Sequence, residues 1–390
     1  MSIQNNIWKL YIIKGLMWFM VAMPIIVLFF QENGLSLQEV MILQGSYSMM
    51  VALMEIPSGY LADLFGRKKT MVLGTLFCFL GFALFSFSFG FWEFLLAELL
   101  LGIGNSFISG SDSALLYDSL LQSKQTDQYT KIEGKTYSIG NFAEAGAGIL
   151  GGFLADMSLR YPWYVQAAIA ALAIPFAISL IEPRVHQENK LEKSFKAILR
   201  VVKYAIVENK LLRWFILFSA ITGVATLSMA WFAQPFFKEV NVPVKWFGFL
   251  WAALNFSVGI SSYHAYKLER IYSKNTILFM VGVSIAAAFL FLGTSATQWG
   301  IFWIFFIYLI RGIATPVLRN YINELTSSEI RATVLSIRSF IIRASFAIVA
   351  PFLGWMADLY SLSYSFWALG LIVGFVSIAC AWKLYILSKN

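Results

Sequence analysis

Apolar stretches of about 20 residues recur along this chain, and no other feature constrains its fold as strongly. A helix of that length is about 30 Å long, which matches the hydrocarbon thickness of a bilayer. Of the 390 residues, 59% are hydrophobic and only 13% are charged, which excludes an ordinary soluble domain. The sequence therefore predicts an all-α membrane protein with about twelve transmembrane helices.

The predicted spans fall into two sets of six, separated by a charged linker. Their approximate centres are Met17, Met50, Phe79, Ser106, Glu144, Ala171, Ile221, Asn255, Ala286, Ile310, Arg343 and Leu371. We expect one bundle over residues 1–181, a linker over 182–210 and a second bundle over 211–390. Apolar and basic residues alternate at helical spacing in the linker, which predicts an amphipathic helix on the membrane lipids.

The positions of lysine and arginine predict the orientation. If the N-terminus is cytoplasmic, the opposite side of the membrane keeps only Arg160, Lys238 and Lys245 as loop cations. The positive-inside rule therefore predicts that both termini are cytoplasmic. The same topology accounts for the net charge of +8, so the charge does not indicate a nucleic-acid partner.

The loop between the second and third spans has a distinctive sequence, GYLADLFGRKK, over residues 59–69. Its three adjacent cations cannot lie in hydrocarbon, so they mark a loop. Asp63 and Arg67 are four residues apart, a spacing that places two side chains on one helix face. The glycines at 59 and 66 permit close helix approach and a tight turn. This segment resembles the signature loop between the second and third helices of the major facilitator superfamily (MFS).

The resemblance implies both a fold and a gate. The fold is two pseudo-symmetric six-helix bundles around a central cavity. In the family pattern an acid at the end of the fourth span, here Asp118, pairs with Arg67, and Asp63 contacts the start of the eleventh span. Residues 324–333 also resemble an inner loop of MFS exporters. The gate residues implied in this way are Gly59, Asp63, Gly66, Arg67, Lys68, Asp118, Glu329 and Arg331.

A weak internal repeat supports two equivalent halves. Residues 152–156 read GFLAD at the end of the fifth span, and residues 354–358 read GWMAD at the end of the eleventh. A separation of six spans is what two six-helix bundles require. The loop signature itself is degraded in the second half, where residues 267–270 read KLER.

Ionisable residues inside the spans are functional candidates, because a charge in the membrane costs several kcal/mol. Glu98, Asn105 and Asp112 are seven residues apart and share one stripe of the fourth span, which we expect to face a wet cavity. The alternative is hydrogen bonding to neighbouring helices within one bundle. Further acids lie on the second and fifth spans. The predicted proton carriers are Glu144 and Asp112, followed by Glu55 and Glu98.

The fourth and fifth spans also depart from the family pattern. Glu98 stands where the family often has an arginine, four residues before the first glycine of a Gly-x-Gly pair, here Gly102 and Gly104. The proton-handling role of that arginine is therefore not carried over. The run over residues 146–152 resembles the glycine motif of MFS antiporters, but its usual Gly-Pro reads Ala-Gly here. Close helix packing is an equally good explanation of this run.

The second half carries arginines in place of acids. Arg311 and Arg343 lie near the middle of the tenth and eleventh spans. Arginine stays charged in a membrane, so each needs a carboxylate or phosphate partner. That partner is either an acid across the cavity or an acidic group of the substrate, and the sequence leaves both open. The candidate substrate-binding residues are Arg311, Arg343, Asn105, Asn141, Tyr137 and Asn255.

Several chemistries have no sequence support. Cys78 and Cys380 lie inside apolar runs, so we expect buried free thiols and neither a disulfide nor a metal site. No nucleotide-binding loop, paired zinc ligands or nucleophile elbow is present, so we expect no cofactor and no enzyme activity.

These features together predict a secondary transporter that works by alternating access. The acids favour proton coupling, and the exporter-like loop favours efflux of a small amphipathic, zwitterionic or acid-bearing compound. We expect a monomer in a bacterial cytoplasmic (inner) membrane, with both termini cytoplasmic. The alternatives are proton-coupled uptake or exchange of an organic anion, a lipid or lysolipid translocator, and a receptor that binds a ligand without transporting it.

Overall fold

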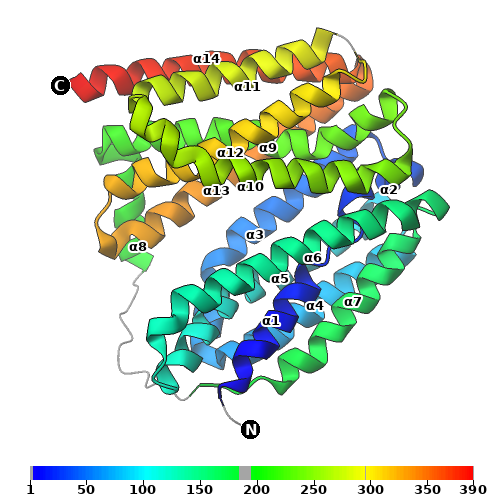
Figure 1. Cartoon of the computed structure of the whole chain (residues 1–390), viewed down its shortest axis with the longest axis vertical. Helices are drawn as coiled ribbons and strands as arrows, with labels where there is room; N and C mark the ends of the chain where they lie inside the picture. The colour runs from blue at the N-terminus through cyan, green and yellow to red at the C-terminus, as the bar shows by residue number, and fades with distance from the viewer. Residues whose placement is uncertain (1–2, 184–194, 295, 390) are drawn as a thin grey trace. The chain divides into compact units, whose positions relative to one another are not determined.

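The computed structural model describes residues 3–183, 195–294 and 296–389, and this part of the chain is almost entirely helical, with no β-strand. Figure 1 shows long helices that follow one another through short connections. Many large apolar side chains are exposed, among them Phe142, Trp299 and Phe375. Such a surface suits a lipid environment rather than water.

The first half of the chain forms six spans. The first span is broken into α1 and α2, which are joined by the short helix η1, and Pro24 lies within η1. The elements are α1 (Asn5–Trp18), η1 (Met23–Ile25), α2 (Ile26–Glu32), α3 (Leu37–Phe65), α4 (Arg67–Phe87), α5 (Phe91–Gln122), η2 (Thr126–Gln128), α6 (Tyr129–Met157) and α7 (Tyr161–Ser179).

The second half forms six more spans after a short helix, α8, and a π-helical turn, η3. The elements are α8 (Phe195–Lys203), η3 (Tyr204–Glu208), α9 (Lys210–Glu239), η4 (Val244–Trp246), α10 (Phe247–Ile271), α11 (Lys274–Thr294), α12 (Gly300–Glu324), α13 (Ser328–Leu359) and α14 (Leu362–Lys389). The predicted amphipathic helix of the linker coincides in part with α8, and its beginning lies outside the described residues.

The long helices differ in polarity. Nine spans in the described part of the chain are long and apolar enough to cross a membrane by length and composition alone. The three others, α3, α6 and α10, have 29, 29 and 25 residues but carry more polar groups. These helices bear Glu55, Tyr137, Asn141, Glu144 and Asn255, which are all candidate functional residues. Three of the spans therefore combine a lower hydropathy with candidate functional residues.

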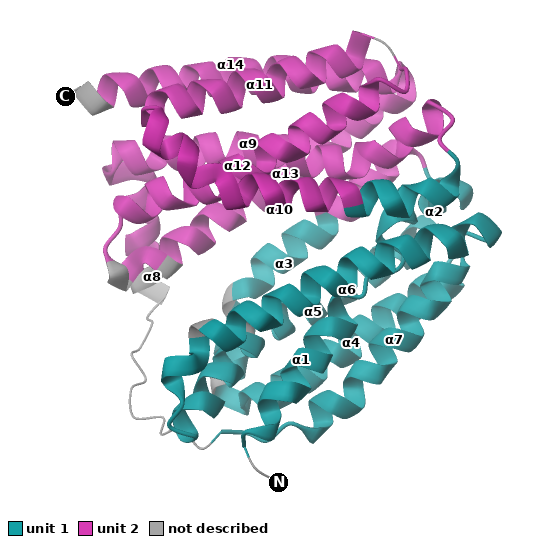
Figure 2. Ribbon diagram, viewed as in Figure 1, with its two compact units in different colours: residues 1–35, 46–190, 243–252 teal, residues 36–45, 191–242, 253–390 magenta. Residues whose placement is uncertain are grey.

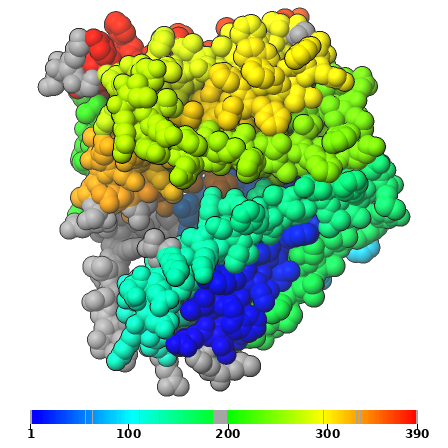
Figure 3. Space-filling view, viewed as in Figure 1, coloured from blue at the N-terminus to red at the C-terminus, as the bar shows by residue number. Residues whose placement is uncertain are grey.

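The chain forms two compact units, shown in Figure 2. Unit 1 comprises residues 1–35, 46–190 and 243–252, and unit 2 comprises residues 36–45, 191–242 and 253–390. The start of α3 thus belongs to unit 2, and η4 with the start of α10 belongs to unit 1. In unit 1, α1 packs against α6 and α7, and the three are neighbours on the face seen in Figure 3.

The internal repeat explains how these two short segments are held. In unit 1, a Cβ on Gly152 would lie 2.8 Å from the carbonyl oxygen of Lys245, just before α10. In unit 2, a Cβ on Gly354 would lie 2.7 Å from the carbonyl oxygen of Leu37, at the start of α3. Each copy of the repeat therefore places a glycine where another helix begins, too close for a side chain. The close-packing explanation of the glycine run is thus supported at Gly152.

An aromatic cluster fixes one end of unit 1. Phe29 of α2, Phe85 of α4, Phe94 of α5 and Trp163 of α7 are fully buried. Phe85 stacks on Trp163 with ring centroids 4.4 Å apart, and Phe29 lies 5.5 Å from Phe94. Large rings from four helices in contact restrict the rotation of each helix about its axis.

Candidate functional site

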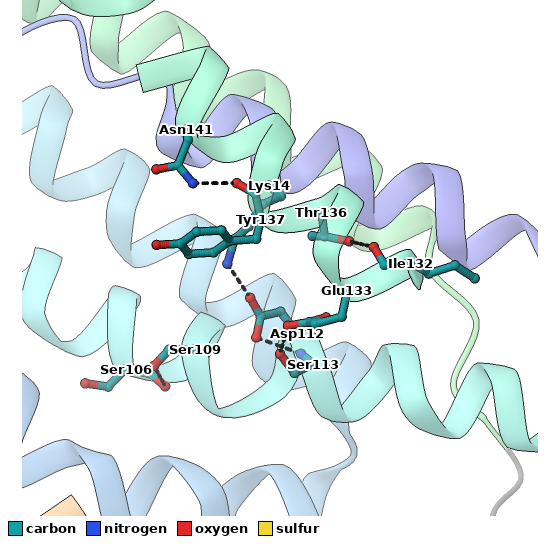
Figure 4. A network of polar contacts seen from close by, with 10 residues as sticks. All are labelled: Lys14, Ser106, Ser109, Asp112, Ser113, Ile132, Glu133, Thr136, Tyr137 and Asn141. Atoms are coloured by element: carbon teal, nitrogen blue, oxygen red, sulfur yellow. Dashed lines mark hydrogen bonds and ion pairs between the residues drawn. The ribbon is translucent and has the colours of Figure 1, made fainter. Parts of the chain in front are cut away.

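A polar network joins α1, α5 and α6 inside unit 1 (Figure 4). The ammonium of Lys14 donates to a carboxylate oxygen of Asp112 at 2.9 Å, and the two side chains are only 18% and 15% exposed. The same ammonium lies 4.8 Å from the ring centroid of Trp18, one turn further along α1, which is a cation–π contact. An ammonium at this depth requires such partners, because an unpaired charge out of water is costly.

Glu133 joins the same network from the first turns of α6. The hydroxyl of Ser113 donates to a carboxylate oxygen of Glu133 at 2.7 Å, and the backbone N–H of Ser113 donates to Asp112 at 2.7 Å. Figure 4 shows Lys14, Asp112, Ser113 and Glu133 converging. Two carboxylates and one ammonium therefore share a small region.

These groups border a pocket whose other walls are mostly apolar. Its apolar lining comes from α1, α4 and α5 and includes Leu10, Ile13, Met17, Met71, Ile108 and Leu116. Lys14, Asp112 and Glu133 are its charged lining residues, so the formal charge of the lining is −1 when all three are ionised. The free space suffices for only about two water molecules.

Sequence reasoning missed both Lys14 and Glu133. Lys14 is a lone cation inside the first apolar run, and its position in a span was the available signal. Glu133 lies between two lysines that the predicted topology places on the cytoplasmic side, but α6 begins at Tyr129 and turns this side chain toward α5. An arginine across the cavity was one expected partner of the acids within the spans, but the ion-pair partner of Asp112 is Lys14.

The predicted stripe on α5 is not uniform. Asp112 and Asn105 line the pocket, and the amide of Asn105 donates to the hydroxyl of Tyr47 on α3 at 3.2 Å. Glu98 is only 2% exposed and lies outside the pocket lining. At one end of the stripe Asn105 and Asp112 line the pocket, and at the other end Glu98 is buried away from it.

The candidate residues of α3, α6 and α10 are more open. Tyr137 is 60% exposed and makes an edge contact with Trp18, with ring centroids 5.7 Å apart. Asn141 is exposed and donates to the backbone carbonyl of Tyr137, one turn earlier. Glu144 is half-buried further along α6, Glu55 is exposed on α3, and Asn255 is half-buried on α10.

The loop signature forms a compact polar cluster in unit 1. The expected pair of Arg67 and Asp118 is present, and Arg67 also donates to the carbonyl of Ala114. Glu182 caps α4, because its two carboxylate oxygens accept the backbone N–H groups of Arg67 at 2.8 Å and Lys68 at 2.7 Å. Sequence reasoning placed Glu182 at the start of the linker and missed this cap.

The two glycines of the signature differ. Gly66 has a φ of +98°, which favours glycine, and a Cβ there would lie 3.0 Å from the carboxylate of Glu182. No described atom lies within 4 Å of the position of a Cβ on Gly59, so a close helix approach there stays a prediction. The tight turn at Gly66 is confirmed.

Part of the predicted gate lies outside the described side chains. This applies to Asp63 and Glu329. Arg331 is exposed and donates to the carbonyl of Thr326 at 3.2 Å. Ser327 occupies the N-cap position of α13, but its hydroxyl makes no cap hydrogen bond.

Unit 2 repeats the Arg67–Asp118 arrangement without its sequence motif. Lys274, the first residue of α11, pairs with Glu324, the last residue of α12. Arg67 is likewise the first residue of α4, and Asp118 lies near the end of α5. The unit 2 pair is more exposed, at 53% and 45% against 25% and 14%. The ion pair therefore recurs where the sequence signature has degraded.

The arginines of unit 2 have no acidic partner among the described residues of their own unit. The guanidinium of Arg311 lies 5.6 Å from the ring centroid of Tyr308. Arg338 donates to the hydroxyl of Ser219 at 2.5 Å. Within the described part of unit 2, the ion pairs are Lys203–Glu208 and Lys274–Glu324. Arg311 and Arg343 thus lie near the middle of their helices without a neutralising carboxylate from unit 2.

Cys78 and Cys380 are buried free thiols, as expected. Among the described residues, no group of three His, Cys, Asp or Glu side chains is placed to hold a metal ion. The charged groups described above therefore carry the candidate chemistry of the chain.

Comparison with known proteins agrees with this architecture. The chain is 22% identical to an uncharacterized MFS-type transporter of Methanocaldococcus jannaschii over 373 residues, which cover 91% of this chain and 92% of the relative. It is 20% identical to the quinolone resistance protein NorA of Staphylococcus aureus over 329 residues, 83% of this chain and 81% of NorA.

Solved structures show the same fold. The nucleoside transporter NupG superimposes with a TM-score of 0.80 at 15% identity, over the whole of both chains. A D-xylose–proton symporter superimposes with a TM-score of 0.73 at 14% identity, over 97% of each chain. The profile of the Major Facilitator Superfamily matches residues 7–315. The chain therefore belongs to the major facilitator superfamily and is a multi-pass membrane transporter rather than an enzyme.

Proposed function

We propose that this transporter is proton-coupled and exports a small amphipathic compound that carries an acidic group. The observation that supports this most strongly is the pair of arginines in unit 2. Arg311 and Arg343 lie near mid-helix and have no acidic partner among the described residues of their unit. An arginine fork binds a carboxylate or phosphate through two hydrogen bonds, so an acidic group of a substrate would satisfy it.

The acids of unit 1 are the proposed proton carriers. Protonation neutralises a carboxylate and lowers the cost of moving it between wet and dry surroundings. Protonation of Asp112 would have a second consequence: it would weaken the ion pair with Lys14 and release that ammonium. Glu144, half-buried on α6, is the second leading carrier, and Glu55 and Glu98 follow.

Efflux is the proposed direction. It is supported by the likeness of residues 324–333 to exporter loops and by the similarity of the chain to a quinolone resistance protein. A sugar–proton symporter shares the fold, so uptake is the competing direction. The Arg67–Asp118 pair, with Asp63, Glu329 and Arg331, is the proposed inner gate of a monomer whose termini both lie in the cytoplasm.

A ligand screen tests the substrate class. Compounds that bind the native state raise the melting temperature of the detergent-purified protein by mass action. We expect acidic or zwitterionic aromatic compounds to stabilise it, and Arg311→Ala or Arg343→Ala to remove the shift. Lys238→Ala, which removes an exposed cation at the end of α9, is the matched control and should keep the shift. Stabilisation by neutral compounds alone would contradict the proposal.

A further inference from the structure

We propose that the pocket between α1, α5 and α6 is a second substrate subsite, which binds a primary or secondary ammonium group through Glu133. This inference rests on the proposed function and deepens it, because it adds an amine to the proposed acid-bearing substrate. The pocket lies wholly within unit 1, among described residues.

The first argument is that the pocket already holds an alkylammonium, which belongs to the protein. The Lys14 ammonium donates to Asp112 at 2.9 Å, and the centroid of the Trp18 ring lies 4.8 Å from it. A carboxylate beside an indole face is the combination that recognises organic cations. The local chemistry is therefore suited to a group of this kind.

The second argument is the surplus carboxylate. Lys14 neutralises Asp112, but no cation in the described part of the chain forms an ion pair with Glu133. The described hydrogen bond to Glu133 comes from a neutral donor, the hydroxyl of Ser113, at 2.7 Å. A carboxylate that is partly withdrawn from water gains most from a charged donor. A second ammonium would bring the formal charge of the lining to zero.

The third argument is size. The free space suffices for about two water molecules, which an ammonium head can replace but a complete drug-sized molecule cannot. The apolar side chains of Ile13, Met17 and Ile108 offer contacts for the carbon atoms next to such a head. The pocket is thus suited to one polar end of an amphipathic compound.

Calorimetric titration of the full-length protein with phenethylamine tests the inference. The neutral analogue 2-phenylethanol measures the apolar contribution alone. Glu133→Gln keeps the shape of the side chain and removes its charge, and we expect it to weaken phenethylamine binding at least tenfold. The affinity for 2-phenylethanol should stay within twofold. Asp156→Asn, an exposed acid at the far end of α6, is the matched control and should leave both affinities unchanged.

A second variant keeps the test decisive if Glu133→Gln folds poorly. Lys14→Met removes the resident ammonium and leaves two carboxylates, so phenethylamine should bind several-fold more tightly. The inference is overturned if wild type does not bind phenethylamine, if Glu133→Gln binds it as well as wild type, or if Lys14→Met abolishes binding. Binding of sodium ions in place of phenethylamine would also overturn the inference, because the site would then hold an inorganic cation.

A separate titration distinguishes this inference from the proposed function. 3-Phenylpropane-1-sulfonate carries an acid and no amine, and its binding should depend on Arg311 and Arg343 but not on Glu133. If only the amine titration fails, the subsite is wrong and the proposed substrate class stands. If only the sulfonate titration fails, the proposed acid-bearing substrate is wrong.

Discussion

The two units have similar helix arrangements, but the charged side chains near the middle of their helices differ in sign. In unit 1 the charged groups within the helices are mostly acids, and Asp112 is neutralised by Lys14 on a neighbouring helix. In unit 2 they are arginines, and Arg311 and Arg343 have no acidic partner among the described residues of that unit. The two units therefore have corresponding helices whose side chains differ in charge. On this contrast rests our proposal that unit 1 carries the protons and unit 2 binds the acidic group of the substrate.

Breaking the charge pair of unit 1 should have the largest effect on stability. Asp112→Asn leaves the ammonium of Lys14 without its carboxylate at a site where both side chains are mostly buried. We expect a loss of about 2 kcal/mol, between the values for surface pairs and fully buried pairs. Thermal unfolding in detergent measures it. The double variant Lys14→Met with Asp112→Asn should recover most of the loss, and a strictly additive double variant would contradict the pairing.

Removing the arginines of unit 2 that have no acidic partner among its described residues should affect binding more than stability. Arg311→Ala should weaken binding of an acidic ligand at least tenfold, about 1.4 kcal/mol, because a charge-assisted hydrogen bond is lost. The melting temperature without ligand should change little, since no acid of unit 2 is left unpaired among the described residues. Calorimetry and thermal shift on the same samples separate the two effects. A large loss of stability without a loss of affinity would show that Arg311 is structural.

The ion pairs Arg67–Asp118 and Lys274–Glu324, which occupy equivalent loops, should differ least in their contribution to stability. Arg67→Ala should destabilise the protein by about 1 kcal/mol, because its partner Asp118 is 14% exposed. Lys274→Ala should cost less than about 0.5 kcal/mol, because both members of that pair are more exposed. Melting curves at low and high salt measure the difference, which should narrow as salt screens the exposed pair. Equal effects would mean that exposure does not distinguish the two loops.

Local pattern was enough to predict the helices, and the family resemblance implied the Arg67–Asp118 pair. Spans depend on hydrophobicity over about 20 residues, and the pair joins a loop signature to a helix end that the family resemblance identifies. The polar pocket was only partly foreseen. Which face of α1 meets α5 depends on how whole helices rotate against each other, and this is not encoded in the spacing within either one.

Three residues show why parts of the polar site and of the loop cluster could not be predicted from the sequence. Lys14 is a single cation in a long apolar run, and one cation does not change the prediction of a transmembrane helix there. Glu133 lies among lysines that resemble a loop, and its role follows from the contact with Ser113 on another helix. Glu182 lies 115 residues from the backbone N–H of Arg67 that it caps. Each partner is distant in sequence, and no local rule connects such pairs.

Gradient-driven transport by the reconstituted protein tests the central claim most directly. Liposomes containing wild type would carry an imposed pH difference and the acidic compound that stabilises the protein best in the ligand screen. We predict accumulation against the concentration gradient of that compound only when the pH difference is present. Asp112→Asn and Glu144→Gln should abolish accumulation while they still exchange labelled for unlabelled compound. Equal accumulation by wild type and both variants, or accumulation without a pH difference, would contradict the account.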